Sequence, residues 1–300
     1  MLKIFVINEQ VQFYQEYCSN ASVGVVYLRV GKLGKLLRRL HLKSRLPMFH
    51  LWYTKSFRTA GKDSETEVIL FDTILTLPAV KYLKKKYPKT RVIYWYWNHI
   101  YHPEWLKEIP NGVEKWSYDP EDCRLYGLRF NTQFYFKSIA DYRIEDFPIA
   151  YDFSFVGAVK SRASQIDKCS KLIDNSGFSK HFVVIDYQTK IKRVHGIPYS
   201  EVVSIVRKSR CVVDILPEAQ KGLSIRPLEA LFMHKKLITN FKPIKDFPFY
   251  SPRNIFIIGH DKDPELHKFM SLPFDHALAD EQSDYYDFKN WLNRFQLPHD

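Results

Sequence analysis

The chain has 300 residues, of which 45% are apolar and 16% aromatic, so it can bury one large core or two of ordinary size. This composition excludes an intrinsically disordered protein. The formal net charge is +12, and residues 1–60 hold ten lysines and arginines against two glutamates, so most of the excess positive charge lies in the first fifth of the chain.

The first residues and the cysteines favour a cytoplasmic protein. The opening sequence MLKIFVINEQ lacks the long apolar region of a signal peptide, and no segment offers the roughly 18 to 20 uninterrupted apolar residues of a spanning helix. The four cysteines include no Cys-x-x-Cys pair and no Cys/His grouping at metal-ligand spacing, which favours reduced thiols. We therefore expect a soluble protein without disulfides or a bound metal.

Residues 29–46, RVGKLGKLLRRLHLKSRL, show the first helical pattern. Leucines at positions 33, 36, 37 and 40 follow the i, i+3, i+4, i+7 spacing of one helix face. The stripe could pack on a sheet, or the helix could lie on an anionic membrane surface, where each basic residue contributes roughly 1 kcal/mol. The basic residues for that second interpretation are Lys32, Lys35, Arg38, Arg39 and Lys43.

Further along, short apolar runs alternate with helical patterns, which is typical of βαβ units and a parallel sheet. In the first half, the sequence predicts strands at 3–7, 67–73, 91–98 and 113–119, and a helix at 77–88. Another helix is predicted to begin at Pro120, with Asp119 as its N-cap.

The alternation pauses after residue 136 and then resumes. Strands are predicted at 153–159, 181–186, 211–216, 236–239 and 254–259, with helices at 163–176, 199–208, 224–234 and 283–296. We therefore predict an α/β protein of two Rossmann-like domains facing a cleft. The predicted parts are an N-terminal domain (1–140), a second domain (141–282) and a C-terminal helix (283–300) that could pack back on the first domain.

The segment DILPEAQKGLSIRPLEALFMHKKLIT, residues 214–239, places a polar loop between two apolar strands. Gly222 would let the backbone approach a ligand, and Ser224 can cap a helix whose free N–H groups suit phosphate. Arg226 lies on the first turn, and Glu229 follows on nearly the same face. Spacing alone leaves two alternatives open: an ion pair on the surface, or a site for phosphate and sugar hydroxyls.

The order of strand, polar loop and GLSIRPLEALFMHKKLIT resembles the donor-site element of GT-B glycosyltransferases, and is especially similar to their CgeB-like, capsule and lipopolysaccharide branch. The stretches YDFSFVGAVKSR, FYSPRNIFII and WSYDPEDCRLYGLRF fit the same branch, so the likeness covers most of residues 67–258. It implies a compact GT-B architecture whose second domain binds the sugar nucleotide and whose first binds the acceptor.

The resemblance also implies an activity. It would be transfer of a sugar from a nucleotide-diphosphate donor, with a UDP-sugar as the first expectation, to a lipid-linked or surface-polysaccharide acceptor. Such an enzyme would act in bacterial glycan biosynthesis at the cytoplasmic face of the membrane, and it would need no obligatory cofactor. Many retaining members have a glutamate where this chain has Lys221, so the retaining or inverting outcome stays open.

The likeness assigns donor contacts to ten positions. Those near the diphosphate would be Gly157, Lys160, Arg162 and Arg226. Tyr199 would contact the base, and Glu229 would hold ribose or sugar hydroxyls. The loop around sugar and phosphate would consist of Gln220, Gly222, Leu223 and Ser224.

A catalytic base should come from strand ends of the first domain, because an inverting transfer must remove the acceptor's proton. The candidates are Asp72, His99 and Asp119, each of which could instead be a cap, turn or loop residue. The triplet DKD at 261–263 is similar to the metal-binding motif of the other major glycosyltransferase fold. Asp263 precedes a proline and is better explained as a helix cap, so we expect no obligatory metal.

Two other functions remain open from the sequence. Net charge, aromatic content and the basic segment are compatible with a nucleic-acid-binding protein. No known nucleic-acid motif is present, however, and most aromatic residues lie within strand patterns, so no nucleic acid is expected as a partner. The second alternative is a non-catalytic glycan-binding protein that kept the GT-B fold.

Overall fold

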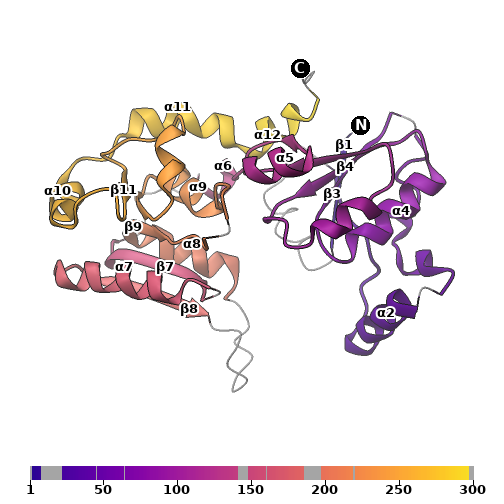
Figure 1. The fold of residues 1–300 in the computed structure, drawn as a ribbon, viewed down its shortest axis with the longest axis horizontal. Coiled ribbons are helices and arrows are strands. Elements are labelled where there is room, and N and C mark those ends of the chain that lie inside the picture. The colour runs from indigo at the N-terminus through magenta and orange to yellow at the C-terminus, as the bar shows by residue number, and fades with distance from the viewer. Residues whose placement is uncertain are drawn as a thin grey trace. The chain divides into compact units, whose positions relative to one another are not determined.

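The computed structural model of the chain describes residues 2–7, 22–44, 46–63, 65–140, 148–159, 161–185, 197–218 and 220–296. The chain divides into two compact units, unit 1 (Met1–Asn131) and unit 2 (Thr132–Asp300). Each unit contains its own parallel β-sheet (Figure 1). The sequence-based boundary was placed nine residues later in the chain, after residue 140.

Unit 1 is built on a six-stranded parallel sheet with the order β2-β1-β3-β4-β5-β6. Its strands are β1 (Leu2–Val6), β2 (Ser22–Val25), β3 (Glu67–Phe71), β4 (Arg91–Tyr96), β5 (Val113–Ser117) and β6 (Arg129–Phe130). The helical elements are α2 (Lys32–Ser44), η2 (Phe49–Trp52), α3 (Lys55–Arg58), α4 (Thr76–Lys86), η3 (Pro103–Glu108) and α5 (Pro120–Tyr126). The central strands are continuous apolar runs because helices and loops cover both faces of a parallel sheet.

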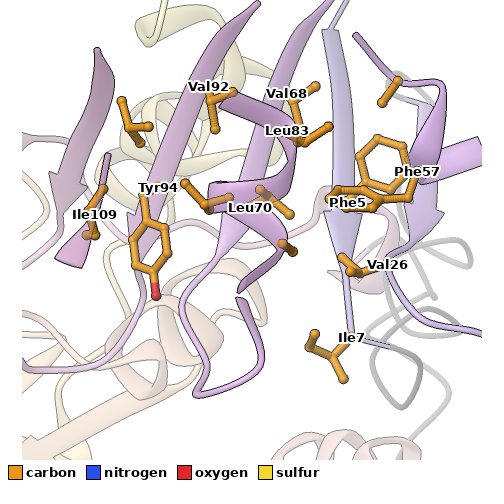
Figure 2. Close-up of a cluster of buried hydrophobic side chains, with 14 of the residues drawn as sticks. Phe5, Ile7, Val26, Phe57, Val68, Leu70, Leu83, Val92, Tyr94 and Ile109 are labelled. Carbon is orange, nitrogen blue, oxygen red and sulfur yellow. The ribbon is translucent and has the colours of Figure 1, made fainter. Parts of the chain in front are cut away.

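The core of unit 1 forms where α4 and the segment around α3 pack against β1, β3 and β4. Figure 2 shows Phe5 against Phe57 and Leu83 above the strands, and the two phenyl rings meet edge to face at 5.1 Å. Tyr94 belongs to the same cluster, but its hydroxyl points toward the carboxyl ends of the strands (Figure 2). The core therefore places the Tyr94 hydroxyl at the edge of the sheet where parallel sheets bind ligands.

Unit 2 is built on a five-stranded parallel sheet with the order β11-β10-β9-β7-β8. Its strands are β7 (Tyr151–Ala158), β8 (Lys180–Ile185), β9 (Ser209–Asp214), β10 (Lys236–Thr239) and β11 (Ile255–Ile257). The helical elements are α6 (Lys137–Ala140), α7 (Ala163–Asn175), α8 (Tyr199–Arg207), α9 (Ile225–Phe232), η5 (Lys242–Asp246), η6 (Asp263–Glu265), α10 (Leu266–Ser271), α11 (His276–Tyr286) and α12 (Phe288–Arg294). Because β7 pairs with both β8 and β9, the strand order reverses beside β7, and such switch points form ligand crevices.

Several predicted element boundaries need correction. The single C-terminal helix predicted at 283–296 is two helices, because Asp287 ends α11 and its carboxylate caps α12 by accepting from Lys289 N. Asp263 is the first residue of η6 and makes no side-chain cap bond, so its prediction as a cap is wrong. The short strands β2 and β6 were not predicted.

Helices α11 and α12 hold the first residues of unit 2. The backbone N–H of Tyr135 donates to Tyr286 O at 2.9 Å, and the N–H of Phe288 donates to Tyr135 O at the same distance. The buried ring of Trp291 packs on Phe134 with a centroid separation of 4.3 Å. These helices therefore complete the core of the unit in which they lie.

Candidate active site

The loop before α9 is fixed by its own side chains at the carboxyl edge of the unit 2 sheet. Gln220 Nε2 donates to Gly222 O at 3.2 Å, and Leu223 is buried. Ser224 is the N-cap of α9, as predicted, since its Oγ accepts from Arg226 N at 3.3 Å. These are residues that the resemblance assigns to a loop around sugar and phosphate, and the structure brings them together in one turn.

Arg226 and Glu229 form an ion pair, but not on the surface. The side chain of Glu229 is 1% exposed and that of Arg226 is 17% exposed. One Glu229 oxygen pairs with Arg226 Nη1, and the other accepts from the Tyr199 hydroxyl at 2.7 Å. Arg226 Nη2 donates to Val156 O near the end of β7 at 2.8 Å. The surface-pair alternative is therefore wrong.

Tyr199 is held inside unit 2 by two polar contacts. Besides its bond to Glu229, its hydroxyl lies 2.8 Å from the hydroxyl of Tyr135. Burial, together with the nearby carboxylate, raises the pKa of Tyr199 far above its usual range, so the phenol stays protonated and acts as a donor. The hydroxyl thus holds the ion pair, which leaves its ring as the part that could contact a base.

Arg162 bridges the two strands that flank the switch point. Its Nε donates to Ala158 O at 3.0 Å, and its Nη1 donates to Ile215 O just after β9. A Cβ placed on Gly157 would lie 2.8 Å from Arg162 Nη2, so glycine is needed for this close approach. Lys160, also assigned to the diphosphate, lies outside the described residues.

Asp214, at the end of β9, is the buried carboxylate of this edge. It is 4% exposed, and Oδ1 accepts from Ser224 Oγ at 3.0 Å. Burial raises its pKa to about 6, although the Ser224 hydrogen bond and the positive charges of Arg226 and Arg162 oppose the shift. The N-terminus of α9 and the guanidinium groups of Arg162 and Arg226 therefore lie at the edge of the sheet where Asp214 ends β9, and N–H groups of these kinds can bind anionic oxygens.

Unit 1 has a cavity of about 320 Å³ at the carboxyl ends of β3 and β4. Asp72 lines this cavity, and its Oδ1 accepts from the Tyr94 hydroxyl at 2.5 Å. Burial raises the pKa of Asp72, an effect that the Tyr94 hydrogen bond opposes. The backbone carbonyl of Asp72 also accepts from Trp97 Nε1 at 3.1 Å. Asp72, one of the three candidate bases named from the sequence, thus lies at the wall of the cavity with one carboxylate oxygen hydrogen-bonded.

His99 lines the same cavity and faces two buried carboxylates. Its Nδ1 lies 3.2 Å from Asp122 Oδ1 without making a hydrogen bond, and 3.8 Å from Asp119 Oδ2. Asp119 caps α5 as predicted, accepting from Glu121 N at 3.0 Å, and Asp122 Oδ2 accepts from Ile100 N at 3.0 Å. Since Nδ1 faces the carboxylates, Nε2 is the ring nitrogen left for a ligand.

These three side chains also form a group that could hold a metal ion. One ligand atom each from His99, Asp119 and Asp122 lie within 4.8 Å of one another. One imidazole nitrogen and two carboxylate oxygens would suit a divalent transition metal. Each carboxylate accepts its backbone N–H bonds through one oxygen and turns the other toward His99. That second oxygen can orient the histidine or bind a metal, and a chelation experiment distinguishes the two.

Helix α2 exposes the leucine stripe that the sequence predicted. Leu33 is 69% exposed, and Leu36, Leu37 and Leu40 are each about half exposed. Figure 1 shows α2 away from the sheet of unit 1, so the stripe does not pack on that sheet. Arg38 is buried at 5% exposure with its guanidinium 4.5 Å from the ring centroid of Tyr27. It therefore differs from Lys32, Arg39 and Lys43, which are exposed, and from Lys35, which is partly exposed.

Three residues of these sites were not found from the sequence. Asp214 could have been found, because it ends an apolar strand and a carboxylate at that position lies beside the switch point of the sheet. Asp122 looked like an ordinary acid in the first turn of a helix. Tyr135 gave no signal, since its partner Tyr199 is distant in the sequence and only the fold brings their hydroxyls together.

No protein-family model matches the sequence, and no curated protein matches it. In the part of the chain that the structure describes, no helix has the length and apolar content needed to cross a lipid bilayer.

The fold, by contrast, is similar to that of several solved structures. It is similar to AviGT4, a glycosyltransferase involved in avilamycin A biosynthesis (TM-score 0.53, 9% identity), with coverage of 99% of this chain and 96% of the other. It is also similar to HepE from Anabaena in complex with UDP-glucose (0.52, 8%) and to the lipopolysaccharide outer core galactosyltransferase WaaB (0.51, 13%), each covering 99% of this chain and 98% of the other. The chain therefore has the GT-B fold, with two Rossmann-like domains.

Proposed function

We propose that this protein is a glycosyltransferase that moves a sugar from a nucleoside-diphosphate donor to a glycan acceptor. One observation carries the proposal: Arg226, paired with buried Glu229, and Arg162 converge at the switch point of a unit whose fold is that of glycosyltransferases. Two guanidinium groups at a helix N-terminus can neutralise the negative charge that develops on a leaving diphosphate.

The other proposed donor contacts lie at the same carboxyl edge of the unit 2 sheet. Ser224 and the turn from Gln220 to Leu223 would surround the sugar and the phosphate nearest to it. Contact of Glu229 with ribose or sugar hydroxyls would require the bound donor to displace part of its covering, since its side chain is 1% exposed and both oxygens already have partners. The Asp214 carboxylate keeps the Ser224 hydroxyl oriented. The AviGT4, HepE and WaaB names, together with the UDP-glucose bound to HepE, support a nucleotide sugar, and a UDP-sugar stays the first choice.

For an inverting reaction, the acceptor hydroxyl must lose its proton as its oxygen attacks the anomeric carbon and the nucleoside diphosphate leaves. We assign His99 as the base that accepts this proton, because its Nδ1 faces Asp122 at 3.2 Å and its ring lines the unit 1 cavity. The developing imidazolium would be stabilised by the buried carboxylates. Asp72 is the second candidate base, and Asp119 acts as a helix cap.

The biological setting is proposed on narrower grounds. The sequence likeness to the CgeB-like branch and the structural likeness to WaaB favour capsule or lipopolysaccharide biosynthesis. The exposed leucines and lysines of α2 fit a peripheral contact with an anionic inner membrane and a lipid-linked acceptor. Donor chemistry at this site is proposed to be independent of metal, because guanidinium groups supply the positive charge.

The decisive experiment is donor binding. A thermal-shift screen with uridine, cytidine, guanosine and thymidine diphosphates should show one nucleotide that raises the melting temperature by mass action. The matching sugar nucleotide should then be hydrolysed slowly, and Arg162→Gln should weaken both effects. A matched control is Arg253→Gln, because Arg253 is a partly exposed arginine of unit 2 on a different edge, where it contacts Asp275 and Pro273 O.

Two results would contradict the proposal. Failure of all four nucleotides to shift the melting temperature would remove the donor site. Salt-sensitive binding of DNA or RNA in the same preparation would instead favour a nucleic-acid-binding protein.

A further inference from the structure

The unit 1 cavity has a chemical character that sets it apart from the rest of this basic protein. It lies at the carboxyl ends of β3 and β4, and its wall runs from Asp72 through the segment 94–102 to Trp105 and Ile109. All of these residues belong to unit 1. The cavity is therefore a feature of one unit by itself.

Its lining contains no positive charge of the kind that binds phosphate. Among the residues that the structure describes, no lysine or arginine lines the cavity, although the protein carries 45 of them. The carboxyl group that does line it is Asp72. An anionic ligand would meet the Asp72 carboxylate here, and none of the described lining residues is a lysine or arginine that could pair with it.

Aromatic rings make up much of the wall. Tyr96, Trp97, Tyr101 and Trp105 line it, and Trp105 is held by stacking on His102 at a centroid distance of 4.5 Å and an interplanar angle of 18°. Tyr101 is 61% exposed, so an aromatic ring stands near the opening with much of its surface uncovered. Flat apolar faces of this kind suit the C–H faces of a sugar ring.

Polar groups are placed among these rings. Asn98 offers both a donor and an acceptor, His99 offers a ring nitrogen, and Asp72 accepts hydrogen bonds. A few fixed polar groups within an aromatic wall match a ligand that has hydroxyl groups around an apolar ring. The volume, about 320 Å³, lies at the lower end of the range for small-molecule sites.

We propose that this cavity binds an uncharged sugar residue of the acceptor, and that it discriminates against uronic acids and phosphorylated sugars. The designation as acceptor rests on the proposed transferase function, whereas the specificity for a neutral saccharide rests on the cavity alone. Phosphate would be recognised in unit 2, where the arginines lie, and the neutral sugar in unit 1. The charged group of the donor and the neutral sugar of the acceptor would thus be recognised in different units of the chain.

The test measures binding without a donor, so that it does not depend on transfer. Saturation-transfer NMR at pH 8 compares methyl glucoside and methyl galactoside with methyl glucuronide and glucose 6-phosphate. The neutral glycosides should bind, and the two anionic sugars should not compete with them. Trp105→Ala should weaken binding about threefold to tenfold, whereas Phe130→Ala, an exposed aromatic residue on β6 of the same unit, should leave it unchanged.

A second variant guards against misfolding. Asn98→Lys adds a cation to the wall and should shift preference toward methyl glucuronide while the melting temperature stays near the parent value. The proposal is overturned if an anionic sugar or a cationic amino sugar binds the parent protein more tightly than the neutral glycosides, or if no sugar binds. If nucleotide still binds in unit 2 in that case, the transferase proposal stands and only the specificity is wrong.

Discussion

The hydroxyl of Ser224 donates to Oδ1 of Asp214 at 3.0 Å while it accepts the backbone N–H of Arg226. The cap of α9 is therefore tied to the end of β9 by a buried carboxylate. Because the cap positions the helix N-terminus, the protonation state of Asp214 bears directly on the proposed donor site.

The stability of unit 2 should depend on pH through Asp214. Its pKa is raised from 3.8 to about 6 in the folded protein, so the folded state holds this proton more tightly than the unfolded state. The group's unfavourable contribution is absent below about pH 4 and grows as pH rises to 6, reaching about 3 kcal/mol at most. Asp214→Asn should remove that contribution, so the difference in unfolding free energy between variant and parent should increase from pH 4 to pH 7. Urea unfolding at four pH values measures it, and a constant difference would contradict the prediction.

The Arg226–Glu229 pair should be strongly coupled. Arg226→Met leaves a buried carboxylate with Tyr199 as its remaining donor among the contacts described above, and should cost about 3–5 kcal/mol. Adding Glu229→Gln removes the stranded charge and should restore part of the loss, as a double-mutant cycle in urea would show. The exposed pair of Glu121 and Arg124 has the same three-residue spacing. Its cycle should show almost no coupling, and equal coupling in the two cycles would contradict this prediction.

Gly157→Ala should weaken donor binding more than it weakens the fold. The new Cβ would lie 2.8 Å from Arg162 Nη2, the far end of a flexible side chain, and 3.0 Å from the ring of Phe155. We expect Arg162 to leave its contact with Ile215 O, which should raise the Kd for nucleotide about tenfold. Gly31→Ala is the control, since a Cβ there meets nothing within 4 Å. Calorimetric titration distinguishes the two, and unchanged affinity in Gly157→Ala would remove Arg162 from the site.

His99→Gln and Asp122→Asn should lower the rate of sugar transfer, the first by about 10²- to 10⁴-fold, with little change in nucleotide affinity. Asp119→Ala should instead cost about 0.5–2 kcal/mol of stability through the lost cap. Prolonged treatment with EDTA should leave transfer unchanged. Loss of activity on chelation, restored by a divalent ion, would show a metal requirement, for which His99, Asp119 and Asp122 are the candidate ligands. If Asp72→Asn alone abolished transfer, the base would have to be reassigned.

Helix α2 should bind anionic vesicles. Replacing Leu36 and Leu40 with serine should reduce sedimentation with phosphatidylglycerol vesicles severalfold, because both side chains are about half exposed and free to enter the headgroup region. Leu125→Ser, which changes a comparably exposed leucine on α5, is the control. Binding by the parent should weaken as salt rises. Equal binding to neutral vesicles would exclude the electrostatic part of the proposal.

Periodicity was enough to predict the architecture. Strands β3, β4, β9 and β10 each contain a short apolar run bounded by polar residues. Such runs are recognisable in the sequence because both faces of a parallel sheet are covered. The caps Asp119 and Ser224 were also found, because a cap acts within three residues of its own position. Local chemistry is visible in the sequence wherever the partners are close in it.

The features that the sequence did not reveal depend on contacts between residues that lie far apart in the chain. The burial of Glu229 requires Tyr199, thirty residues earlier, and the contact of Arg226 with Val156 spans seventy. The same three-residue spacing gives an exposed pair at Glu121 and Arg124, so spacing alone could not tell a buried pair from a surface pair. The exposure of the α2 leucines likewise depends on what the fold leaves uncovered.

The backbone bonds that join Tyr135 to Tyr286 and Phe288 also have a consequence for synthesis on the ribosome. The related bond from Lys137 N to Asp287 spans 150 residues. A nascent chain emerges from its N-terminus, so unit 1 can close its sheet while unit 2 still lacks α11 and α12. Until those helices arrive, the aromatic side chains of Phe134 and Phe136 are left without the covering that Phe288 and Trp291 provide. Unit 2 should therefore be the part of the nascent protein that most needs protection by chaperones.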